Sequence, residues 1–140
     1  MGDILDPIRS ATFNASVTTA DRTGRADAER AAAAKIILDI KSLLTVLTRT
    51  LLRSKSTTIR SLLQDASVLS RSVRLEIGVE RASRELISAA NDLRISVADL
   101  RLRCIRTRLS LASKMDLERL ATLTQLLCGN LHKWAEAGDL

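Results

Sequence analysis

The stretch LRLRCIRTRLSL, residues 100–111, decides the fold class of this 140-residue chain. Read two residues at a time, its apolar and polar side chains alternate as they do along a half-buried β-strand. A strand needs a partner, however, and the residues that turn one strand into the next are scarce. Pro7 is the only proline, and Gly78 is the only glycine between residues 26 and 128. Read at spacings of three and four, the same stretch instead continues an apolar series that starts upstream.

That series is a heptad repeat, which makes the stretch helical. Its members, spaced by four, three, four, three, four and seven residues, are Leu86, Ala90, Leu93, Val97, Leu100, Cys104 and Leu111. Such spacing gives a helix one apolar seam that packs against another helix. Phe13 and Trp134 are the only aromatic residues, and a core of aliphatic side chains suits helix-on-helix packing. We therefore predict an all-α protein, an elongated antiparallel bundle of three to four helices.

The same periodicity, followed outward, gives the expected domain organisation. Residues 1–25 are polar and aperiodic, which predicts a disordered N-terminal arm, and residues 26–140 form a single helical domain. The expected helices span about 26–52, 58–77, 79–112 and 114–128, followed by a short C-terminal turn at 130–137. A slip of the apolar register favours a break near Gly78. One continuous rod over 58–112 is the alternative, because a glycine costs a helix only about 1 kcal/mol.

Polar residues mark the expected helix ends. The run SKSTT at 54–58 supplies a loop and an N-cap for the second helix. Ser113 and Asp116 have the spacing of a capping box, which places the start of the fourth helix there. Gly129 is expected to end that helix. The short loop at 54–58 predicts that the first two helices pack antiparallel.

A second apolar seam lies about 150° around the third helix from the first, if the helix has a 3.5-residue repeat. Its members are Ile95, Ala98, Leu102, Ile105 and Leu109. Two seams need two partners, and a chain of three or four helices supplies one of them internally. We therefore predict a homodimer with coiled-coil-like packing, whose interface includes Leu102, Ile105 and Leu109.

The charge of the chain favours a polyanionic partner. The net charge is +6, carried by 17 Arg and 5 Lys against 16 acidic residues. On the second helix the charges are sorted by sign: at about 100° per residue Asp65 and Glu76 fall on one flank of the apolar stripe. The opposite flank carries Arg60, Arg71 and Arg74. The alternative interpretation of these cations is a solvated face with local ion pairs.

Arginines of the third helix fall into two groups. Arg94, Arg101 and Arg108 lie between its two seams, where they are expected to pair with acids or to extend into a groove. Arg103 and Arg106 lie on its polar side and are free to meet a ligand. The predicted nucleic-acid-binding residues are therefore Arg60, Arg71, Arg74, Arg103 and Arg106.

Motifs for catalysis and cofactor binding do not occur in the sequence. It contains no phosphate loop, glycine-rich dinucleotide fingerprint or nucleophile elbow. Cys128, His132 and Glu136 are spaced by four and four, as metal ligands on a helix would be, but Gly129 is expected to interrupt that helix. We therefore predict no enzyme activity, no cofactor and no metal site, with His132 and Trp134 at the edge of the core.

The compartment is predicted from three features. Cys104 and Cys128 are far apart and are expected to be reduced thiols, which indicates an intracellular, cytoplasmic protein. The first residues, MGDILDPIRS, lack the basic start of a signal peptide. The most apolar segment, residues 36–52, contains Asp39, Lys41 and Arg49, so no membrane span is expected.

Two functions are compatible with these features. The first is binding of double-stranded RNA through its phosphates by a helical dimer, independent of base sequence. Arg binds phosphate bidentately, and the chain has too few aromatic residues to stack single-stranded bases. In composition and layout the chain is similar to the small insect-virus silencing suppressors, which bind double-stranded RNA on a helical dimer face. The second is a protein-interaction module, such as an adaptor, chaperone or host-targeted effector, whose apolar seam binds an acidic or helical protein.

The composition also suggests an origin. Leu, Arg and Ser make up 55 of the 140 residues, and these are the amino acids with six codons. Such a bias arises when one reading frame overlaps another, as in small viral accessory proteins. A gene without an overlapping frame would contradict this hypothesis.

Overall fold

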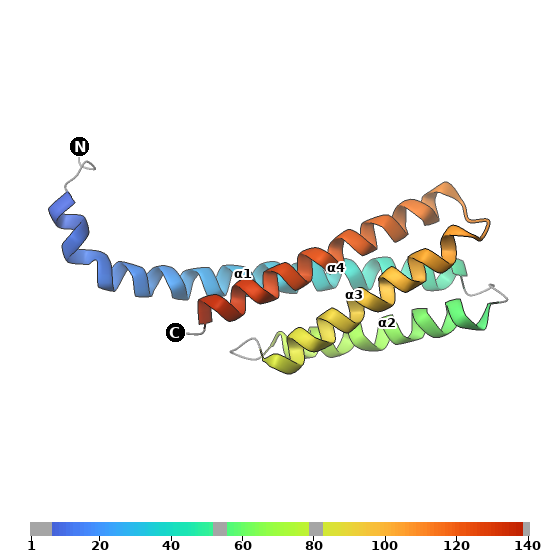
Figure 1. Ribbon diagram of the computed structural model, residues 1–140, viewed down its shortest axis with the longest axis horizontal. Coiled ribbons are helices and arrows are strands. Elements are labelled where there is room, and N and C mark those ends of the chain that lie inside the picture. Colours follow the sequence, from blue (N-terminus) through green and yellow to red (C-terminus); the bar gives the residue numbers. More distant parts are fainter. Residues whose placement is uncertain (1–6, 52–55, 79–82, 139–140) are drawn as a thin grey trace.

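The computed structural model describes the backbone of residues 7–51, 56–78 and 83–138 (Figure 1), and side chains from residue 24 onward. Over these residues the chain is all-helical and contains no strand. The helices are α1 (Pro7–Leu51), α2 (Thr57–Glu76), α3 (Arg84–Ile105) and α4 (Leu111–Gly138). The predicted all-α helical bundle is thus confirmed. The dimer and its coiled-coil packing stay predictions.

Helix α1 starts earlier than the sequence suggested. It begins at Pro7, whereas the sequence predicted a disordered arm over residues 1–25 and a helix from residue 26. Proline is favoured in the first turn of a helix, because the N–H that it lacks would have no partner there in any case. The helix also continues through Gly24. Residues 1–6 of the predicted arm lie outside the described residues.

The helix ends at Glu76 and a new one begins at Arg84, so the predicted break near Gly78 is present and the alternative, one continuous rod over 58–112, is wrong. Ser56 caps α2 by accepting a hydrogen bond from the Ile59 N–H at 3.3 Å, as the SKSTT run predicted. Ser83 does the same for α3 by accepting from the Leu86 N–H at 3.0 Å. The Arg30 guanidinium closes the end of α2, since it donates to the carbonyl oxygens of Ile77 at 3.0 Å and Gly78 at 2.7 Å.

The stretch 100–111 is a helix end followed by a turn. The prediction that the third helix continues to residue 112 was wrong, because α3 ends at Ile105. Thr107 stops it: its Oγ1 donates to the Cys104 carbonyl at 2.8 Å, and so does its backbone N–H at 3.1 Å. Ser110 then accepts from the Ser113 N–H at 3.1 Å and begins α4. The predicted cap at Ser113 therefore lies three residues too late.

Helix α4 runs through Gly129, so the predicted stop there was wrong and the predicted turn at 130–137 is part of the helix. Leu127, Leu131 and Trp134, on both sides of the glycine, are at most 2% exposed. Burying these side chains stabilises the helix by more than the roughly 1 kcal/mol that a glycine costs. Trp134 is accordingly a core residue and not an edge residue, whereas His132 is exposed.

Among the described residues, each helix packs against two neighbours, in the cyclic order α1, α2, α3, α4, and neither α1 with α3 nor α2 with α4 is in contact. In Figure 1, α1 pairs with α4 and α2 pairs with α3. The apolar seam of α3 faces the core along its length: Leu86, Ala90, Leu93, Val97, Leu100 and Cys104 are buried. Leu111 does not belong to this seam, because it is 73% exposed at the start of α4. The cyclic order places the α1–α2 face opposite the α3–α4 face.

None of the helices, over the part of the chain that the structure describes, is both apolar enough and long enough to cross a membrane. This agrees with the expectation for residues 36–52.

Candidate nucleic-acid interface

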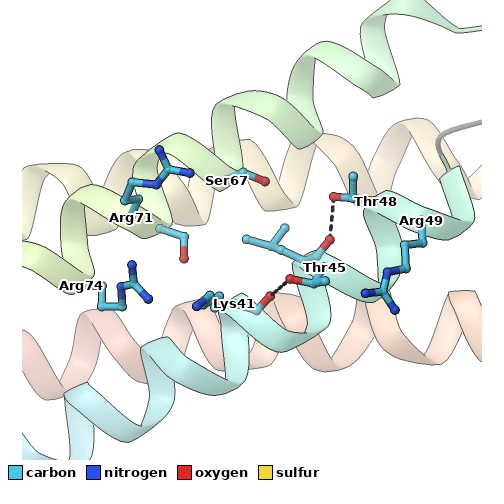
Figure 2. Close-up of a pocket in the computed structure, with 9 residues that line it drawn as sticks. Lys41, Thr45, Thr48, Arg49, Ser67, Arg71 and Arg74 are labelled. Atoms are coloured by element: carbon cyan, nitrogen blue, oxygen red, sulfur yellow. Dashed lines mark hydrogen bonds between the residues drawn. The ribbon is translucent and has the colours of Figure 1, made fainter.

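A groove between α1 and α2 gathers positive charge. It encloses about 490 Å³, within the range of ligand-binding clefts. Figure 2 shows its two walls, with Arg71 and Arg74 on α2 and Lys41 and Arg49 on α1. The remaining lining residues are Leu44, Thr45, Thr48, Ser67 and Ser70. No acidic residue is among them.

The four cations of this groove have no partner among the residues that the structure describes. Within the described residues the ion pair is that of Arg101 with Glu118, and no side-chain nitrogen of Lys41, Arg49, Arg71 or Arg74 forms a hydrogen bond. Residues of the same helix cannot neutralise them either, because no acidic residue lies three or four positions from any of these four cations. Like charges that share a groove repel one another and favour an anion between them.

Hydroxyl groups also line the groove. Thr45 and Thr48 donate to backbone carbonyls one turn earlier, at 2.9 Å to Lys41 and 2.6 Å to Leu44 (Figure 2). Ser67 and Ser70 have no hydrogen-bond partner within the described part of the chain. Their hydroxyls can therefore donate to an anion oxygen without breaking an existing bond.

The groove continues along α2 toward Arg60. A second hollow of about 160 Å³ is lined by Arg60, Leu63 and Gln64, and it shares Thr48 and Ser67 with the main groove. The predicted residues Arg60, Arg71 and Arg74 thus line one continuous surface. Asp65 and Glu76 line neither hollow, as the sorting of charge by sign implied.

The other two predicted residues are not brought to this surface. Arg103 is in the last turn of α3, and Arg106 is its C-cap. Both are exposed, but neither lines the groove or the adjoining hollow.

Two of the three arginines between the seams of α3 donate hydrogen bonds within the chain. Arg101 donates from Nε to Glu118 Oε1 at 2.6 Å, and Arg94 donates to Asn91 Oδ1 at 2.8 and 3.2 Å. Arg108 lies exposed in the α3–α4 turn.

Sequence reasoning missed the α1 wall of the groove. Lys41, Thr45, Thr48 and Arg49 follow one another at steps of four, three and one, which places them on one side of a helix. Asp39 is not part of this set. The sequence therefore shows that these residues share one side of α1. It does not show that this side faces Arg71 and Arg74, because that depends on how α1 and α2 are aligned.

The predicted dimer surface is accessible in part. Leu102 and Ile105 are 62% and 61% exposed, as an interface with a second chain requires. Leu109 is half-buried and packs against the core of its own chain. It therefore exposes less of its side chain to a second chain than Leu102 and Ile105 do. Its position follows from the end of α3 at Ile105, since Leu109 lies in the turn and not on the seam.

Cys128, His132 and Glu136 lie on one unbroken helix, so the predicted interruption at Gly129 was wrong. Steps of four residues, however, place the first and third side chains about 12 Å apart along the helix axis, which is too far for all three to bind one ion. The described residues contain no group of three metal-ligating side chains.

Both cysteines are free thiols, Cys104 buried and Cys128 half-buried. Burial raises the pKa of the Cys104 thiol above its ordinary value. Burial also raises the pKa of the Cys128 thiol, although the charge and hydrogen bond of Arg94 act in the opposite direction. Thiols with raised pKa values are poor nucleophiles.

No protein-family model, curated protein or solved structure matches the chain.

Proposed function

We propose that this protein binds the phosphate backbone of duplex nucleic acid, double-stranded RNA above all, through the basic groove between α1 and α2. The observation that carries the proposal is that Lys41, Arg49, Arg71 and Arg74 line one groove and have no ion-pair partner and no neighbouring acid in its lining, as far as the described residues extend. A cationic groove without internal neutralisation attracts a polyanion, and phosphates supply the missing negative charge.

The types of side chain favour phosphate. The planar guanidinium groups of Arg71 and Arg74 can donate two parallel hydrogen bonds to phosphate oxygens. Ser67 and Ser70 add neutral donors beside them. Because Arg60 extends the same surface along α2, the cations can contact more than one phosphate of a backbone.

The scarcity of aromatic residues favours a duplex over a single strand. Proteins that bind single strands stack the bases on aromatic side chains. Trp134 is 2% exposed and packs in the core, so it offers no such platform. The other aromatic residue, Phe13, lies where side chains are not described. Contacts restricted to the backbone imply binding that is independent of base sequence.

The proposal includes no catalytic step, and a homodimer is part of it. A role as a viral accessory protein or silencing suppressor is the biological setting that best fits double-stranded RNA binding of this kind. Its test is whether the protein protects double-stranded RNA from cleavage into short fragments.

A second candidate function is a protein-interaction module. The observation in its favour is the group of apolar side chains on α3 and at the start of α4 that are more than half exposed, namely Ile95, Leu102, Ile105, Leu111 and Met115. Surfaces of this kind bind helices. In that case the basic groove would bind an acidic segment of the partner or would only keep the protein in solution.

The experiment compares two triple variants with equal loss of charge. Arg60→Gln, Arg71→Gln and Arg74→Gln together remove three groove cations. Affinity for a double-stranded RNA should fall by about ten- to a hundredfold, because each lost phosphate contact weakens binding. Double-stranded DNA and single-stranded RNA of equal length are measured alongside, and weaker binding of both is expected.

The control variant carries Arg84→Gln, Arg119→Gln and Lys133→Gln. These three cations are exposed and lie outside the groove, on α3 and α4. This variant should bind within about twofold of the wild type, after correction for net charge. Equal loss of binding in the two variants would contradict binding of RNA by the groove. Freshly purified protein that retains a protein partner but contains no nucleic acid would favour the interaction module.

A further inference from the structure

The outer face of α3 has no neighbour within the bundle. Ile95, Leu102 and Ile105 are 51%, 62% and 61% exposed, and Ala98 lies between them. Their spacing of three, four and three residues is that of a coiled-coil seam. At the same end of the bundle, Leu111 and Met115 of α4 are 73% and 62% exposed. An apolar strip of this regularity is typical of a surface that pairs with another helix.

The surface beside this strip is hollowed. A depression of about 170 Å³ between α3 and α4 borders Ile105, and its lining residues are Arg101, Cys104, Ile105, Lys114, Leu117 and Glu118. The strip therefore faces outward next to a concavity.

The two borders of the strip carry opposite charge. On a heptad repeat, Asp92 and Asp99 fall on one border, which ends with Arg106 at the C-cap of α3, and Arg94 and Arg101 fall on the other. Asp92 and Asp99 are exposed and have no ion-pair partner within the described chain. Arg101 is already neutralised by Glu118 at 2.6 Å, whereas Arg94 uses its donors only on a neutral amide, that of Asn91, and on the Cys128 thiol. The unsatisfied acids and the unneutralised Arg94 are thus on opposite sides of the same strip.

We propose that a second copy of this chain covers the strip, with the two α3 helices parallel and Arg94 of each copy beside Asp99 of the other. In a parallel pair, Arg94 of each copy faces Asp99 of the partner, five residues further along, while Arg101 is neutralised within its own chain by Glu118. An antiparallel pair would instead place Arg beside Arg and Asp beside Asp. The charges of the strip therefore select a two-fold dimer of identical chains, with the same patch on both copies.

The dimer would present two basic grooves. Because the α3–α4 face is opposite the α1–α2 face, joining two copies through α3 leaves both grooves exposed on the outside. This consequence rests on the proposed function, whereas the dimer itself does not. If both hold, one dimer can bind two duplex segments at once, which raises its overall affinity for long duplexes.

The first test is sedimentation of the full chain in the absence of nucleic acid. The wild type should be a dimer at micromolar concentrations. Leu102→Glu should weaken the dimer at least about tenfold, because it places a charge in an apolar interface. The control is Leu75→Glu, at a side chain that is 68% exposed but on α2, and it should remain a dimer. A monomeric wild type, or equal effects of the two variants, would overturn the proposal.

The second test uses reciprocal charge reversal. Asp99→Arg alone should weaken the dimer by about tenfold or more, and so should Arg94→Glu alone, because each places like charges together. An equal mixture of these two variants should form heterodimers, in which both pairs between positions 94 and 99 are again of opposite sign. Failure of the mixture to associate, when both variants keep the helical circular dichroism of the wild type, would refute the parallel pairing.

Arg94 also contacts its own chain, so Arg94→Glu can damage the fold. In that event Asp99→Arg is compared with Asp65→Arg, which reverses an exposed acid on α2. Loss of the dimer only in Asp99→Arg supports the proposal, and equal behaviour of the two variants contradicts it.

The outcome is independent of the groove. Leu102→Glu should still bind a short double-stranded RNA, with one site per chain, if the groove is the binding surface. A monomeric wild type that binds RNA would overturn the dimer and leave RNA binding by the groove standing, and a dimer that binds no RNA would overturn the groove and leave the dimer standing.

Discussion

Arg101 of α3 donates from Nε to Glu118 Oε1 of α4 at 2.6 Å and so joins the two helices across the α3–α4 face. The sequence placed Arg101 between two seams and required an acid or a groove for it, and Glu118 is that acid. This pair occupies one of the four arginines of residues 100–111, while Arg103, Arg106 and Arg108 of that stretch are exposed. The unpaired cations of Lys41, Arg71 and Arg74 lie instead on the opposite face of the bundle.

The Arg101–Glu118 ion pair should contribute little to stability. The two side chains are 41% and 60% exposed, so water screens their attraction. Arg101→Gln should lower the free energy of unfolding by less than about 1 kcal/mol in urea titrations. A loss of several kcal/mol would show that the pair is shielded from water, which could arise if a second copy covers it.

Leu100 and Leu102 distinguish the helix from the strand that the stretch imitates. In a strand they would share one face, but here Leu100 is fully buried while Leu102 is 62% exposed. Leu100→Ala should cost about 2–5 kcal/mol of unfolding free energy. Leu102→Ala should cost less than about 0.5 kcal/mol when measured at concentrations too low for self-association. Equal costs would contradict the helical arrangement of this stretch.

The seams of this bundle could be predicted because they depend on the period of a single helix. The end of α3 could not, because no glycine or proline marks it. Thr107 and Ser110 end one helix and start the next through hydrogen bonds with the backbone over three residues. The same residue types occur inside α1, where Thr45 donates to the carbonyl one turn earlier without ending the helix. The residue type alone therefore does not tell which threonine ends a helix. That depends on how the surrounding residues pack in the bundle.

The site could be predicted only for one of its two walls. Arg60, Arg71 and Arg74 were identified because their charges are sorted by sign around α2. Lys41 and Arg49 were not, because their meeting with Arg71 and Arg74 depends on how α1 and α2 are aligned, which the period of neither helix specifies. Arg103 and Arg106 were selected for their exposure alone, and exposure does not bring them to the groove.

Gly129 is an opportunity to stabilise α4. A Cβ at this position would meet no atom within 4 Å, and the residue lies inside the helix. Gly129→Ala should raise the free energy of unfolding by about 0.5–1 kcal/mol, because alanine loses less backbone entropy on folding. Gly78→Ala is the comparison: its Cβ would lie 3.3 Å from the Leu75 carbonyl oxygen, so no gain is expected. A destabilised Gly129→Ala would indicate that α4 is not helical there.

The buried thiols should weaken the fold at alkaline pH. An unfolded chain titrates its thiols near the ordinary pKa of 9.0, while burial raises the pKa of Cys104 in the folded chain. Between these two pKa values the folded chain keeps a proton that the unfolded chain has released. The free energy of unfolding is therefore unaffected below about pH 9 and falls as the pH rises through the folded pKa.

Cys104→Ala should reduce this alkaline loss when urea unfolding is measured over a series of pH values. Cys104→Ser is a second variant without a titrating thiol and should behave likewise. A pH dependence identical to that of the wild type in both variants would show that Cys104 does not contribute.

The salt dependence of double-stranded RNA binding tests the central claim most directly. Binding constants are measured over a range of salt concentrations for the wild type and for the variant Lys41→Gln, Arg49→Gln, Arg71→Gln, Arg74→Gln. The logarithm of the wild-type constant should fall steeply with the logarithm of salt, and the slope of the variant should be shallower by about one unit for each cation that contacts a phosphate. Equal slopes for the two proteins, or wild-type binding that is insensitive to salt, would contradict recognition of phosphates by the α1–α2 groove.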